Sequence, residues 1–101
     1  MTPAPQEYVQ PITALLEGLS TTEFGMRLRP EFTPFLEADS ECVQFKLGKR
    51  KGDDGLTMFL RVSLQHYKPE DGRYVLTLDA KARIMAACEA FCQGQGPNFA
   101  V

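Results

Sequence analysis

Residues 48–55, GKRKGDDG, place three consecutive cations and two consecutive carboxylates between glycines. The cations are side chains that neutralise phosphates, and each such contact would add salt-dependent affinity for a nucleic acid. Asp53 and Asp54 follow closely and cancel most of that positive field. This adjacent pair also supplies too few oxygen ligands for a calcium loop. We therefore interpret the stretch as a solvated hairpin tip. The alternative is a phosphate-contacting loop formed by Lys46, Lys49, Arg50 and Lys51.

Cysteine and histidine are common zinc ligands, and the chain contains Cys42, His66, Cys88 and Cys92. Together these residues could form a site with three thiolates and one imidazole. Zinc sites commonly contain short CxxC pairs, however, and this sequence has none. Cys88 and Cys92 lie four residues apart in an alanine-rich stretch, which is typical of small buried side chains in a helix. We therefore expect no metal and no cofactor.

The motifs of common catalytic sites are missing from the sequence. It has no GxSxG nucleophile turn, no GxGxxG fingerprint and no GxxxxGK[ST] phosphate loop. General acid–base catalysis by His66 would need a positioned partner, and the nearby carboxylates, Glu70 and Asp71, lie in a predicted turn. We therefore predict that the protein is not an enzyme.

The composition is that of one ordinary globular domain. The chain has 101 residues, of which 44% are apolar and 24% charged, and a net charge of −2. The slight acidic excess argues against a dedicated binder of double-stranded DNA. No apolar run approaches the roughly 20 residues of a membrane span, so we expect no membrane partner. An odd number of cysteines and an N-terminus without signal-peptide features favour reduced thiols and a cytoplasmic location.

Apolar periodicity predicts the elements that would position these residues. Steps of three and four indicate an N-terminal helix over 11–19, and an alanine-rich stretch with Asp79 as N-cap indicates a C-terminal helix over 80–93. Alternation predicts a strand over 23–29, followed by a packed loop. The predicted strands after that loop are 42–47, 56–65 and 73–78. Their short connections favour an antiparallel meander.

These elements predict an α+β fold, a two-layer sandwich with a mainly antiparallel sheet of 3–4 strands. The N- and C-terminal helices would pack on one face of the sheet. We expect a single domain over 1–101, with 1–6 and 97–101 loosely ordered. The predicted core consists of Val43, Phe45, Leu60, Val62, Leu64 and Ile84.

The other face of the sheet would then be open, and it carries the predicted partner-binding residues Phe59, Arg61 and Tyr67. Tyrosine and arginine are enriched among the residues that dominate protein interfaces. We therefore predict a small non-catalytic protein-binding domain, an adaptor, inhibitor or regulatory subunit, acting through the open face or a strand edge. A homodimer is one such arrangement. The alternative is a single-stranded nucleic-acid-binding protein that uses the same aromatics and the basic loop. A small enzyme ranks third.

Overall fold

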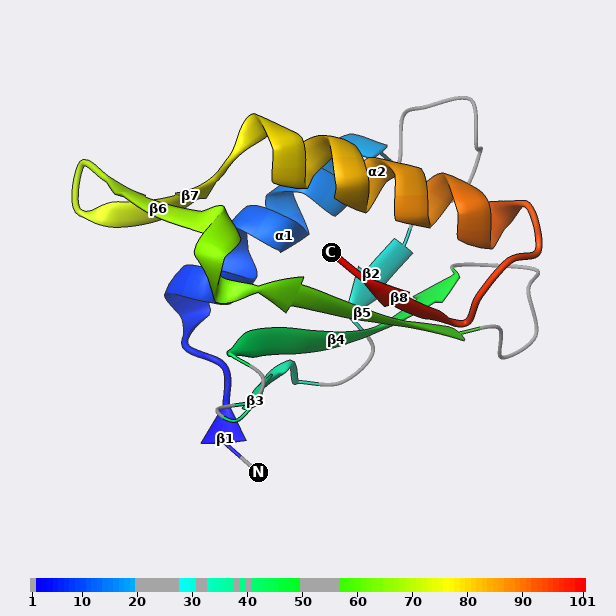
Figure 1. Cartoon of the computed structure of the whole chain (residues 1–101), viewed down its shortest axis with the longest axis horizontal. Helices are drawn as coiled ribbons and strands as arrows, with labels where there is room; N and C mark the ends of the chain where they lie inside the picture. The colour runs from blue at the N-terminus through cyan, green and yellow to red at the C-terminus, as the bar shows by residue number, and fades with distance from the viewer. Residues whose placement is uncertain (1, 20–27, 31–32, 38, 40, 50–56) are drawn as a thin grey trace.

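A computed structural model describes residues 2–19, 28–30, 33–37, 39, 41–49 and 57–101 of the chain (Figure 1). The helices are α1 (Gln6–Leu19) and α2 (Leu78–Cys92). The strands are β1 (Thr2–Pro3), β2 (Leu28–Pro30), β3 (Phe35–Glu37), β4 (Cys42–Lys49), β5 (Thr57–Ser63), β6 (Tyr67–Glu70), β7 (Arg73–Leu76) and β8 (Asn98–Ala100). The predicted α+β class is therefore confirmed.

The sheet is larger than predicted and is mixed rather than a simple meander. Within the described residues, six strands form one sheet in the order β1-β3-β4-β5-β8, with β2 pairing β4 beyond the end of β3. The antiparallel β4–β5 hairpin agrees with the prediction, and Val43 lies opposite Val62. β8 pairs with β5 in parallel. The sheet therefore contains strands from both ends of the described chain.

The long strand predicted over 56–65 ends at Ser63 instead. A 3-10 turn, Leu64–His66, follows it, and the Ser63 hydroxyl accepts a hydrogen bond from the Gln65 N–H at 3.4 Å. β6 and β7 then form a separate two-stranded sheet, which extends away from the main sheet in Figure 1. Its loop, Asp71 and Gly72, has φ values of 51° and 78°, which suits a two-residue hairpin turn. The strand predicted over 73–78 is therefore present as β7, but it belongs to this second sheet and not to the main sheet.

Alternation along β4 and β5 places one face of each strand in the core, as predicted. Val43, Phe45, Leu60, Val62 and Ile84 are fully inaccessible to solvent, whereas Leu64 is only partly buried because it begins the 3-10 turn. The two described helices complete one continuous cluster and lie on the same side of the sheet (Figure 1). They contribute Val9, Ile12 and Leu16 from α1, and Ala80, Ile84, Ala87, Cys88 and Phe91 from α2.

Both helix starts differ from the prediction. α1 begins at Gln6, so Pro11 lies inside the helix, where it has no N–H to donate to the carbonyl of Glu7. Burial of Ile12 and Leu16 against the sheet offsets this loss. α2 is capped by Thr77, whose hydroxyl accepts from the Ala80 N–H at 3.1 Å. The predicted cap, Asp79, lies in the first turn.

The segments predicted as loops or loose ends contain short strands. β3 lies within the predicted loop after residue 30, and β1 pairs with it. The tail predicted as loosely ordered contains β8, where the Phe59 N–H donates to Pro97 O and the Val101 N–H to Arg61 O, both at 2.8 Å. Residues 20–27 lie outside the described residues. Of the strand predicted over 23–29, only its end is therefore described, within β2.

Candidate functional site

One face of the main sheet is not covered by either described helix, and we call it the open face. Residues directly opposite each other in an antiparallel ladder point to the same face, so the strand register identifies its members. They all alternate with the buried residues of β4 and β5 or pair with residues that do. The open face comprises Phe35, Glu37, Cys42, Gln44, Lys46, Thr57, Phe59, Arg61, Ser63, Asn98 and Ala100.

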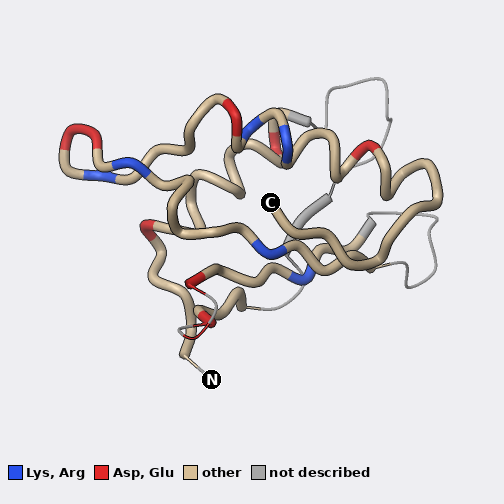
Figure 2. Tube along the Cα trace, viewed as in Figure 1, with Lys and Arg blue, Asp and Glu red and all other residues tan. Residues whose placement is uncertain are grey.

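Two phenylalanines flank a polar centre on this face. Phe59 lies opposite Lys46 on β4 and beside Asn98 on β8, whereas Phe35 lies opposite Gln44. Both phenylalanines are partly exposed, in contrast to the fully buried Met58 and Leu60 on either side of Phe59. Figure 2 shows basic positions on the neighbouring strands β4 and β5. Aromatic and cationic side chains are therefore close together on the open face.

Arg61 is held across the sheet by Glu37. Its Nε donates to Glu37 Oε1 at 3.1 Å, so the side chain spans from β5 over β4 to β3. The arginine side chain is 44% exposed and the glutamate 20%. An ion pair this exposed contributes at most about 1 kcal/mol to stability, but it fixes the position of the guanidinium. Arg61 is therefore oriented toward β3.

Cys42 lies on the open face but is shielded from solvent. It is opposite both Glu37 and Ser63 in the ladder and is only 5% exposed. Burial raises the pKa of its thiol above the ordinary value, and the charge of Glu37 raises it further, while Arg61 acts in the opposite direction. The thiol therefore stays protonated near neutral pH and is a poor nucleophile.

Tyr67 does not lie on the open face, contrary to the sequence prediction. The 3-10 turn redirects the chain before it, and the side chain is 7% exposed and belongs to the core cluster. Its ring packs edge-on against Tyr8 at 4.9 Å, and its hydroxyl donates to the Tyr8 carbonyl oxygen at 2.8 Å. Burial raises its pKa well above the ordinary value. Tyr67 therefore joins the β6–β7 hairpin to α1.

The basic loop is described only at its start. Lys46 is partly exposed on the open face, and Lys49 ends β4. Arg50 and Lys51 lie outside the described residues. The phosphate-contacting loop therefore stays a prediction.

The residues considered for zinc are dispersed over three parts of the fold. Cys42 is on β4, Cys88 and Cys92 are on α2, and His66 is buried at the end of the 3-10 turn. Among the described residues, no three histidine, cysteine, aspartate or glutamate side chains converge to hold a metal ion. Burial raises the pKa of the Cys88 thiol to about 12, which is typical of a structural cysteine.

Sequence reasoning missed Phe35 and Glu37, the contribution of β3 to the open face. Phe35, Leu36 and Glu37 do alternate between the two faces of the sheet. Three residues that follow Pro34 are too short a pattern to separate a strand from a loop. Only the pairing with β4 in the structure identifies these residues as a strand.

Comparisons of the chain with protein-family models, curated proteins and solved structures found no match. Neither described helix is long and apolar enough to cross a membrane. The candidate functional features of the described residues are therefore the open face and the surface pockets.

Proposed function

We propose that this chain is a small non-catalytic protein-binding domain that contacts its partner through the open face. The observation that carries the proposal is the asymmetry of the sheet. In the described part of the chain, one face packs into the core with α1 and α2, whereas the other presents two partly exposed phenylalanines and an arginine that pairs with Glu37. Aromatic and arginine anchors of this kind dominate the energetics of protein interfaces. An adaptor, inhibitor or regulatory subunit would use such a surface.

The charges of the open face define the chemistry of the partner. Its charged side chains, among the described residues, are Lys46 and Arg61, which are positive, and Glu37, which is negative, so the face is net positive on a chain of net charge −2. A partner of matching chemistry presents an apolar patch bordered by a carboxylate. The carboxylate would approach Lys46 and Arg61, and the apolar patch would cover Phe59.

Contact through the open face is favoured over contact through a strand edge. The edge strands of the main sheet, as far as it is described, are β1, with two residues, and β2 and β8, with three each. Such short edges offer few backbone groups to an added strand.

The proposal includes a reducing, cytoplasmic setting, which is supported by the three free cysteines, two of them buried.

The same face supports a second candidate, binding of a single-stranded nucleic acid. The specific observation is the cross-strand pair of Phe59 and Lys46, because single-strand binders combine aromatic stacking with cations that track the backbone. The two candidates differ in their salt dependence. Phosphate contacts release counterions, so nucleic-acid affinity falls steeply with salt, whereas packing of an apolar patch does not.

The test uses the full chain as bait in lysate with and without nuclease treatment, at low and high salt, with quantitative mass spectrometry of the captured proteins. Phe59→Ala and Arg61→Ala are expected to reduce capture of the partner by about tenfold or more, as for interface anchors. Leu78→Ala, at an 83% exposed leucine on α2, is the control and should leave capture unchanged. Thermal unfolding of each variant verifies that it is folded.

Three outcomes would reject the proposal. Capture that survives both open-face substitutions would place the contact elsewhere. Capture that vanishes with nuclease and with added salt, and with charge reversal of Lys49, Arg50 and Lys51, would support the nucleic-acid candidate. In the third outcome, the purified chain sediments as a dimer that Phe59→Ala disrupts. The occupant of the face would then be a second copy.

A further inference from the structure

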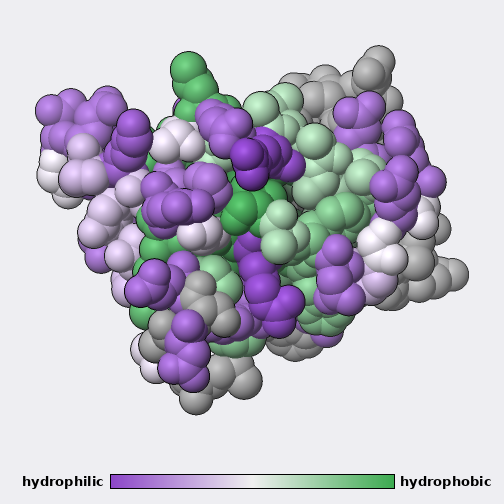
Figure 3. All heavy atoms as spheres, in the orientation of Figure 1, coloured by the Kyte–Doolittle hydropathy of each residue, from purple (hydrophilic) through white to green (hydrophobic). Residues whose placement is uncertain are grey.

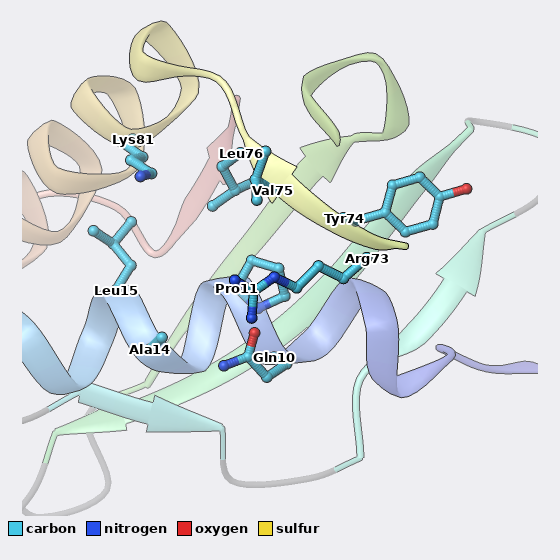
Figure 4. A pocket seen from close by; sticks show the side chains of 9 residues that line it. All are labelled: Gln10, Pro11, Ala14, Leu15, Arg73, Tyr74, Val75, Leu76 and Lys81. Carbon is cyan, nitrogen blue, oxygen red and sulfur yellow. The ribbon is translucent and has the colours of Figure 1, made fainter. Parts of the chain in front are cut away.

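A pocket of about 310 Å³ lies between α1, β7 and the first turn of α2 (Figure 4). Its apolar wall includes Pro11 and Leu15 from α1 and Leu76 from β7. Neither the open face nor its ion pair contributes to the lining. The pocket is therefore a separate feature, on the helical side of the sheet.

Two cations from different elements line this pocket. Arg73 of β7 extends toward Gln10 of α1, and Lys81 of α2 lies on the other side of Leu76 in the view of Figure 4. Within the described part of the chain, neither cation forms an ion pair, whereas nearby Arg83 pairs with Asp79 at 3.0 Å. No carboxylate of the described residues lines the pocket, which therefore combines an apolar wall with two cations. Glu70, opposite Arg73 in the β6–β7 ladder, and Glu7, which lines a neighbouring pocket with Arg73, lie outside this lining.

The position of Lys81 strengthens this positive field. It lies in the first turn of α2, where the helix dipole favours anions and disfavours cations. The carboxylate of that turn, Asp79, is occupied by Arg83 on the helix surface. A bound anion would interact favourably with Lys81 and with the positive end of the helix dipole. The local charge arrangement is thus favourable to an anionic ligand.

We propose that this pocket binds a small organic carboxylate with a compact apolar body. The carboxylate would lie in the combined positive field of Arg73 and Lys81, and the apolar body would pack against Pro11, Leu15 and Leu76. The volume is at the low end of small-molecule pockets, which run from about 300 to 1,000 Å³, and this favours a compact ligand. An inorganic anion would leave the apolar wall unused, and a neutral apolar molecule would leave the cations uncompensated.

The chain contains a built-in reporter for this site. Its three tyrosines, Tyr8, Tyr67 and Tyr74, form one cluster with ring centroids 4.9 to 6.2 Å apart, and the sequence has no tryptophan. Tyr74 lines the pocket. Tyrosine fluorescence therefore comes entirely from the pocket and its immediate surroundings.

The experiment titrates the full chain with hexanoate, and follows tyrosine fluorescence and backbone amide shifts in nuclear magnetic resonance spectra. We expect saturable binding with a dissociation constant on the order of 1 mM, about −4 kcal/mol, with shifts centred on residues that line the pocket. Three probes separate the possible sources of affinity. Hexanamide keeps the apolar body without the charge, acetate keeps the charge with little apolar body, and inorganic phosphate is an anion without carbon.

Substitutions assign the affinity to the pocket. Arg73→Gln and Lys81→Gln should each weaken hexanoate binding by about fivefold, the upper range for exposed charges, and the double variant should bind hexanoate no better than hexanamide. Ala14→Leu should exclude the ligand by filling the pocket with a good helix former. Lys68→Gln is the matched control, because Lys68 is on the same hairpin but does not line the pocket, and it should change nothing.

Several results would overturn the proposal. Equal binding of hexanoate and hexanamide would show an apolar site without anion recognition, and equal binding of hexanoate, acetate and phosphate would show charge attraction alone. An effect of Lys68→Gln as large as that of Lys81→Gln would also point to nonspecific attraction. An acidic peptide that binds more tightly than every small carboxylate would assign the pocket to a protein segment. Absence of saturable shifts would remove the site altogether.

Discussion

At the scale of single residues, burial raises the pKa of the Cys88 thiol and of the Tyr67 phenol. Cys88 is fully inaccessible within the core, and burial raises its pKa from the ordinary value of 9.0 to about 12. The pKa of Tyr67 is also raised, and burial is again the main cause. Both groups are therefore neutral at physiological pH, and both make the folded state sensitive to alkali.

The raised pKa of Cys88 predicts a loss of stability on the alkaline side. Below its ordinary pKa of 9.0 the thiol is neutral in folded and unfolded chains alike, so its contribution is fully present. From there to about 12 the unfolded chain releases the proton while the folded chain retains it, and the free energy of unfolding falls. The fall from this one group is at most about 1.4 kcal/mol per pH unit.

Urea unfolding measured between about pH 8 and pH 10 checks this sign, because Tyr67 adds its own effect mainly above that range. The slope of unfolding free energy against pH should be shallower in Cys88→Ala than in the unsubstituted chain. Cys92→Ala is the matched comparison on the same helix, since the charge of Cys92 is the smaller cause of the raised pKa of Cys88 and burial the larger, so the slope should change less than in Cys88→Ala. Equal slopes in the two variants would show that the buried thiol does not carry the alkaline sensitivity.

At the scale of elements, the connection from α2 to β8 depends on glycine geometry. Gly96 has a φ of +101°, and a Cβ there would stand 2.6 Å from the Phe99 ring. Gly94 has a φ of +94° with open space around it, and Gly18 lies in α1 with neither constraint. Substitution at these three positions therefore distinguishes the cost of backbone strain from the cost of steric contact, because Gly96 has both, Gly94 only the first and Gly18 neither.

Alanine substitution at these three glycines should give three different results. Gly18→Ala should stabilise the chain by about 0.5–1 kcal/mol, because alanine is the better helix residue. Gly94→Ala should cost about 1–2 kcal/mol from backbone strain alone, and Gly96→Ala should cost more because Phe99 must also move. Thermal or urea unfolding measures all three. If Gly94→Ala and Gly96→Ala cost the same, the Phe99 ring adapts freely and the contact carries no energy.

The elements that sequence predicted well are those with long local patterns. Alternation in β4 and β5 predicts their pairing and their buried face, because a slip of one residue would expose Phe45 and Leu60. The end of β5 could not be predicted in this way, since the alternation continues through Leu64. There the Leu64 N–H donates to Glu41 O at 2.9 Å, a bond to a distant part of the chain. That turn moves Tyr67 away from the open face.

Elements that depend on pairing with a distant segment were missed, because such pairing leaves no pattern in the local sequence. β8 has three residues, and its parallel partner β5 lies far earlier in the sequence, so no local period indicates it. The start of α1 was misplaced because Pro11 is more favourable in a first turn than in a helix interior. Tertiary packing of Val9 and Ile12 overrides that preference. The open face could therefore be predicted from β4 and β5, but not its β3 and β8 borders.

At the scale of the whole molecule, the two proposed surfaces belong to different layers joined by one core. The open face is formed by the main sheet, and the pocket by α1, α2 and the β6–β7 hairpin. Figure 3 shows apolar and polar residues intermixed over the side of the molecule that it presents, with polar residues gathered at the hairpin. Tyr67 and Leu76 connect the hairpin to the same buried cluster as Phe45 and Leu60.

This continuity predicts that the hairpin does not unfold separately. An isolated two-stranded sheet is marginal at best in water, so β6 and β7 depend on packing against α1. The tyrosines report only on that region, whereas far-UV circular dichroism reports on both helices and the sheet. Because one hydrophobic cluster spans both regions, the two signals should give the same urea midpoint.

Tyr67→Phe makes the test sharper, because it removes the 2.8 Å hydrogen bond to the Tyr8 carbonyl and leaves two tyrosines as reporters. The loss should be about 1 kcal/mol, and in a single cooperative unit it must shift both midpoints by the same amount. A tyrosine transition at lower urea, or one that shifts alone in Tyr67→Phe, would contradict this prediction. The hairpin and the start of α1 would then open as a local unit, and the pocket between them would be present only while that unit is closed.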